Sequence, residues 1–100
     1  PKPRINASWK LILSQVCQDE GGRPMIHMLY SQPGPDDRAR TLSLHFIPLQ
    51  EGSDEKLRLK ENQPVRISDE GFPVLGWREG SWICTACSPD LELQELRAEL

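Results

Sequence analysis

No stretch of this sequence approaches the roughly 18 to 20 uninterrupted apolar residues that a membrane-spanning helix needs. Its beginning also lacks the apolar core and small-residue cleavage site of a signal peptide. We therefore expect a soluble chain without a membrane span.

Cysteine is scarce, with Cys17, Cys84 and Cys87 the only three. This odd number is too small for the disulfide frameworks of small secreted domains and favours a reducing, cytoplasmic location. Residues 6–8, Asn-Ala-Ser, match the glycosylation acceptor pattern, but we interpret them as turn residues before Trp9.

An excess of positive charge is also missing. The chain has 12 Lys and Arg against 15 Asp and Glu, a net charge of -3. This is the wrong sign for a domain that gathers phosphates over its whole surface, so a nucleic-acid partner is unlikely on sequence grounds.

The sequence contains no glycine-rich phosphate loop, nucleophile elbow or metal-binding helix pair. His27 and His45 have no nucleophile or paired carboxylates at matching positions. Cys84 and Cys87 lie three residues apart, but zinc needs four ligands and a strand would point the two thiols to opposite faces. We expect buried structural cysteines and no catalytic residue, metal or cofactor, and keep a small metal- or thiol-dependent enzyme as the second alternative.

One hundred residues, 37% of them apolar, are enough for one core. Prolines and basic residues dominate residues 1–7, which we expect to form a flexible arm before a single globular domain over 8–100.

Turn signals divide that domain into runs of strand length. The cleanest alternation places Leu42, Leu44 and Phe46 on one face of a strand over 41–47. Residues 8–18 fit both a strand and a helix, and the Gly-Gly turn that follows favours the strand. Further strands are expected over 23–32, 56–60, 65–67, 72–77 and 82–87.

A helix is predicted at the C-terminal end. The Ser-Pro-Asp segment 88–90 combines a capping residue, a proline suited to the first turn and an acid at the positive end of the helix. Leu93, Leu96 and Leu100 then share one stripe up to the last residue.

These elements predict a mainly β fold, an antiparallel meander of six to seven strands that forms a small barrel or two packed sheets closed by the C-terminal helix. The alternative is an α+β fold in which N- and C-terminal helices flank an antiparallel sheet. In both, the expected core contains Leu11, Leu13, Ile26, Leu44, Phe46, Leu57, Leu59, Ile67, Val74 and Trp82.

The leading functional hypothesis is a non-catalytic protein-protein interaction module or small scaffold, which binds a protein partner or a second copy through a strand edge or the groove beside the C-terminal helix. Leu91 lies off the leucine stripe and would be exposed on a helix packed only against its own sheet, so we consider it either a structural residue or part of a partner surface. The candidate partner-binding residues are Trp77, Trp82, Leu91, Leu93, Leu96 and Leu100.

The first alternative is a module that binds an anionic ligand, a phospholipid head group or nucleic acid, on a basic strand face. This face consists of Lys56, Arg58, Lys60 and Arg66. Such charges also keep exposed strands from pairing, which is the competing interpretation.

Overall fold

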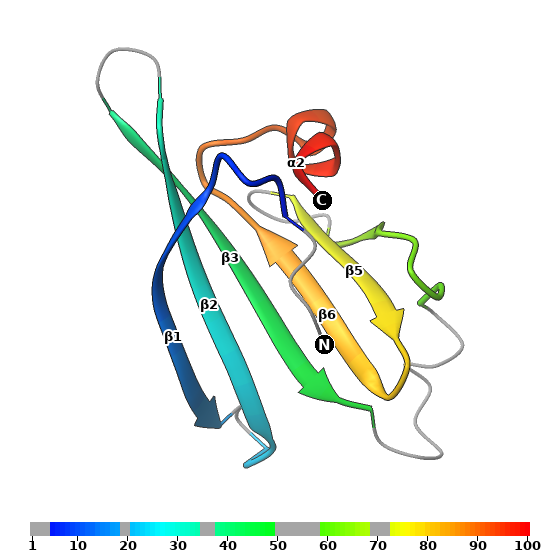
Figure 1. The fold of residues 1–100 in the computed structure, drawn as a ribbon. Helices are drawn as coiled ribbons and strands as arrows, with labels where there is room; N and C mark the ends of the chain where they lie inside the picture. Colours follow the sequence, from blue (N-terminus) through cyan, green and yellow to red (C-terminus); the bar gives the residue numbers. More distant parts are fainter. Residues whose placement is uncertain (1–4, 19–20, 35–37, 50–58, 69–72) are drawn as a thin grey trace.

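The computed structural model describes residues 5–18, 21–34, 38–49, 59–68 and 73–100 (Figure 1). These residues form six strands and one C-terminal helix, which confirms the mainly β prediction. The elements are β1 (Lys10–Gln18), β2 (Pro24–Pro33), β3 (Ala39–Pro48), β4 (Val65–Ser68), β5 (Val74–Glu79), β6 (Trp82–Cys87) and α2 (Leu93–Glu99).

The six strands make one antiparallel sheet in the order β1-β2-β3-β6-β5-β4. The predicted meander is wrong at one point, because β3 pairs with β6, with Leu44 opposite Ala86, and β4 lies at the far edge. β3 and β6 each bury one side along most of their length and therefore belong at the centre, whereas β4 has only four residues. The sheet has two edges, β1 and β4, and is not closed into the predicted barrel.

Residues 10–18 are a strand, so the preferred prediction for this segment is confirmed and a helix there is wrong. β1 pairs with β2, and Gly22 between them has a φ of 82°, which a residue without Cβ adopts at little cost. The pairing is irregular between Leu11 and Leu13, where Ile12 is the extra residue of a β-bulge.

The core lies on one face of the sheet, beneath the N-terminal segment and α2 (Figure 1). The alternation of β3 is confirmed, because Leu42, Leu44 and Phe46 are all buried. The other buried members of this cluster are Trp9, Tyr30, Leu75, Trp77, Cys84, Ala86, Leu91 and Leu96.

Several predicted core residues are instead exposed. Leu11, Leu13 and Ile67 are 40 to 44% exposed because, among the described strands, β1 and β4 each have a neighbour on one side only. Leu59 is buried as predicted, whereas Leu57 lies outside the described residues. The remaining predicted core residues are half-buried, namely Ile26, Val74 and Trp82.

The helix begins later than predicted, at Leu93. Ser88 does not cap it, because its hydroxyl donates to the Thr41 carbonyl and accepts from the Asp90 amide. The Asp90 carboxylate accepts from the Thr41 amide at 2.8 Å, so this segment is tied to β3. A capping box with Glu92 as the N-cap residue starts the helix instead. The described residues contain no helix with the length and apolar character to cross a membrane.

The segment before β1 packs on α2. Ile5 contacts the core, and the backbone N–H of Asn6 donates to the backbone carbonyl of Glu99 at 3.0 Å. Asn6 Oδ1 accepts from the Ser8 amide, which confirms the turn interpretation of this segment. Trp9 Nε1 donates to Glu99 Oε2 at 2.8 Å and fixes the helix over the sheet.

Candidate functional site

The basic strand face is only partly described. Lys56 and Arg58 lie outside the described residues. Lys60 belongs to an isolated bridge with Gln63, and the described part of 56–60 contains no strand. Arg66 is exposed on β4. The described residues therefore do not bring these cations onto one strand.

Trp77 and Trp82 occupy different environments on the β5-β6 hairpin. Trp77 lies opposite Cys84 and is 2% exposed, which makes it a core residue. Trp82 lies opposite Glu79 and is half-buried. The two indoles are therefore not a directly opposed cross-strand pair.

The leucines at the C-terminal end also differ in burial. Leu96 is fully buried, and Leu93 and Leu100 are half-buried against the core. Leu91 is 4% exposed, so the expectation that it would be exposed is wrong. It precedes the helix and reaches the core from an extended segment.

Cys84 and Cys87 point to opposite faces, as their spacing predicts. Cys84 pairs with Phe46 on the covered face, and Cys87 pairs with Ser43 on the other. Burial, with a hydrogen bond from Cys84 Sγ to Glu79 Oε2 at 3.4 Å, raises the pKa of Cys84 to about 12. Burial also raises the pKa of Cys87. Protonated thiols are poor nucleophiles and metal ligands.

Histidines and acids do not supply a metal centre either. His27 and His45 are cross-strand partners on β2 and β3. Their rings stack, and His27 Nε2 lies 3.4 Å from Ser43 Oγ. Nowhere in the described ranges do three or more His, Cys, Asp or Glu side chains gather as a set of metal ligands.

The turn before β4 is fixed to β5 through Arg78. The backbone N–H of Arg78 donates to the Lys60 carbonyl at 3.0 Å, and the backbone N–H of Asn62 donates to the Arg78 carbonyl at 2.8 Å. Arg78 Nε donates to the Leu59 carbonyl, and its guanidinium pairs with Glu61 at 3.8 Å. Asn62 has a φ of 55°, a conformation that asparagine tolerates better than most residues.

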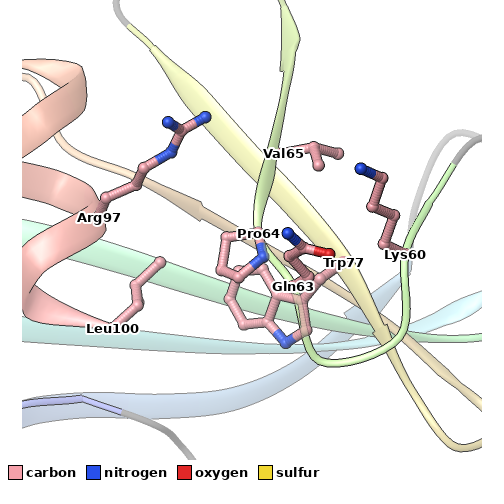
Figure 2. Close-up of a pocket in the computed structure, with 7 residues that line it drawn as sticks. All are labelled: Lys60, Gln63, Pro64, Val65, Trp77, Arg97 and Leu100. Carbon is pink, nitrogen blue, oxygen red and sulfur yellow. The ribbon is translucent and has the colours of Figure 1, made fainter.

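This turn and α2 enclose a pocket of about 480 Å³ above β5, within the size range of small-molecule sites (Figure 2). Its apolar lining comes from Pro64, Val65, Trp77 and Leu100. Its polar lining comes from Lys60, Gln63 and Arg97. No local sequence pattern predicts that Arg97 and this turn line one pocket, because the two segments come together only in the folded chain.

The two cations of the pocket lie on opposite sides of its apolar part (Figure 2). Glu61, the neighbour of Lys60, is turned toward Arg78. Within the part of the chain that the structure describes, no carboxylate forms an ion pair with Lys60 or Arg97. The pocket therefore carries positive charge that no described side chain neutralises.

A second candidate surface is the outer edge of β1, which no described strand covers (Figure 1). Val16 is 75% exposed and Ile12 is 54% exposed. Lys10 is the only charged residue of this nine-residue strand. Apart from the bulge at Ile12, β1 has few of the features that keep edge strands from pairing.

No protein-family model, curated protein or solved structure matches this sequence. The function must therefore be argued from the pocket and the β1 edge themselves.

Proposed function

We propose that this domain is a non-catalytic protein-interaction module that binds by adding a partner's extended strand to the β1 edge. The observation that carries the proposal is the combination of a strand edge that no described strand covers with exposed apolar side chains at Ile12 and Val16. Main-chain hydrogen bonds supply affinity in this mode of recognition, and alternate side chains supply specificity.

A second copy of the chain is the partner that β1 fits. In an antiparallel pair of β1 strands centred on Ser14, Ile12 of each copy lies beside Val16 of the other. Apolar and β-branched cross-strand pairs stabilise such contacts. Lys10 lies near the end of this pair, where its charge stays in solvent.

The test is the mass of the protein in solution over a range of concentrations, measured by light scattering after gel filtration. We expect a monomer-dimer equilibrium in the wild type and a monomer for Val16→Lys, because a charge on an exposed edge opposes pairing. Val16 is largely exposed, so at protein concentrations where the wild type is monomeric this change should leave the unfolding midpoint unchanged.

Gln94→Lys is the matched control, because it adds the same charge at an exposed position on α2. It should dimerise like the wild type. Amide hydrogen exchange should also slow in β1 as the concentration rises. A wild type that stays monomeric, with β1 exchange independent of concentration, would contradict the proposal.

A further inference from the structure

We propose that the pocket between the turn before β4 and α2 binds a small dicarboxylic acid with an apolar spacer. The proposal does not depend on pairing at the β1 edge, because the pocket lies near β4, at the opposite edge of the sheet. The spacer lies over Val65 and Leu100, and the two carboxylates pair with Lys60 and Arg97.

The first step of the argument is the shape and chemistry of the pocket. A volume of about 480 Å³ suits a small ligand but leaves no space for a folded partner. Pro64, Val65, Trp77 and Leu100 supply apolar surface, so the middle of the ligand must be apolar to gain from burial there.

The second step is charge. Lys60 and Arg97 flank the apolar part from opposite sides, and neither is paired with a described carboxylate (Figure 2). A ligand with one acid group neutralises one of these cations, whereas a ligand with an acid at each end neutralises both. Arg97 offers the planar fork of donors that matches a carboxylate, and Lys60 offers a compact point charge.

The third step is positioning. The backbone of Lys60 is held by the Arg78 amide, and α2 is held by Trp9 through Glu99. Both cations therefore project from elements fixed to the core, while their side chains remain exposed and free to adjust to a ligand. This arrangement lowers the ordering cost of binding at the level of the backbone.

The experiment compares three probes with the same eight-carbon chain: suberate with two carboxylates, octanoate with one and 1,8-octanediol with none. Binding is followed by titration in ¹H-¹⁵N correlation spectra, so that the location of the site is read together with the affinity. We expect shifts in residues 60–65 and 97–100, and the affinity order suberate, octanoate, octanediol.

Lys60→Gln and Arg97→Gln should each weaken suberate binding by roughly two- to fivefold, the range of an exposed ion pair. Each variant should also reduce the advantage of suberate over octanoate. Both positions are exposed, so the fold is retained. Lys10→Gln removes an equal charge from β1 and serves as the control that leaves affinity unchanged.

Higher salt should weaken suberate more than octanediol, because exposed charge pairs are screened. Three results would overturn the proposal: shifts elsewhere in the chain, octanediol binding as tightly as suberate, or equal affinities in wild type and both glutamine variants. None of these results bears on dimerisation through β1, so the two proposals can fail independently.

Discussion

His27 and His45 stack in parallel across β2 and β3, with ring centroids 4.5 Å apart and planes 2° apart. They lie on the face of the sheet opposite the core, in the same row as Thr85 of β6. Burial lowers the pKa of His45, and the nearby charge of His27 lowers it further. The folded state therefore favours the uncharged imidazole of His45.

The lowered pKa of His45 predicts that the free energy of unfolding falls in mild acid. Because the pKa of His45 is lower in the folded state, the unfolded chain takes up more protons as the pH drops below the ordinary value of about 6.5. The contribution of uncharged His45 to the free energy of unfolding is therefore present above about pH 6.5 and is lost below it. Urea unfolding at about pH 7.5 and 5.5 measures the difference. His45→Gln should show a smaller loss, and an equal loss in both proteins would exclude His45 as the cause.

Helix packing predicts a large effect at one leucine and a smaller effect at its neighbour. Leu96→Ala should lower the free energy of unfolding by about 2 to 5 kcal/mol, because the side chain is fully buried. Leu93→Ala should cost less, because Leu93 is only half-buried. The denaturation midpoint should shift with little change in m-value. A wild-type midpoint for Leu96→Ala would mean that the helix does not stabilise the sheet.

The two buried indoles should respond differently to replacement by phenylalanine. Trp77 Nε1 is buried and has no hydrogen-bond partner among the described residues, whereas Trp9 Nε1 donates to Glu99. Trp77→Phe removes an unsatisfied donor, which offsets part of the packing loss. Trp9→Phe should therefore be more destabilising, by about 1 kcal/mol or more. Thermal or urea unfolding of the two variants measures which is less stable. A Trp77→Phe variant less stable than Trp9→Phe would contradict the hydrogen bonding described for the two indoles.

Thiol reactivity should follow burial. Cys84 is completely buried with a pKa of about 12, so iodoacetamide should not modify it in the native protein near pH 8. Cys17 is more accessible on edge strand β1 and should react first. Peptide mass spectrometry after timed alkylation assigns the order. Early labelling of Cys84 would show that β6 opens or that its thiol is accessible.

Strong local patterns were predictable from the sequence. The alternation of Leu42, Leu44 and Phe46 located β3 and its buried face, because one face of a strand repeats every second residue. The turn signal after residues 8–18 also predicts the strand that the structure shows as β1, but the prediction that Leu11 and Leu13 lie in the core is wrong. Alternation reports which residues share a face, but it does not report whether a strand lies at the edge.

Long-range pairing was beyond sequence reasoning. The insertion of β6 between β3 and β5 depends on which strands bury their faces best, a property of the whole sheet. The pocket could not be predicted for the same reason, because Lys60 and Arg97 come to line one pocket only when the chain folds. The helix start was misplaced because Ser88 uses its hydroxyl on Thr41, a contact that local capping rules do not contain.

The β3-β6 seam also sets the order in which we expect the chain to fold. The β1-β2, β2-β3 and β5-β6 hairpins join neighbours in sequence, whereas Leu44 must pair with Ala86 across an intervening segment that includes β4 and β5. Bringing β3 and β6 together costs chain entropy before any contact between them forms. The high contact order at the centre of the sheet therefore limits the folding rate. The β1-β2-β3 unit and the β5-β6 hairpin therefore form early, and the pairing of β3 with β6 is the late, slow event.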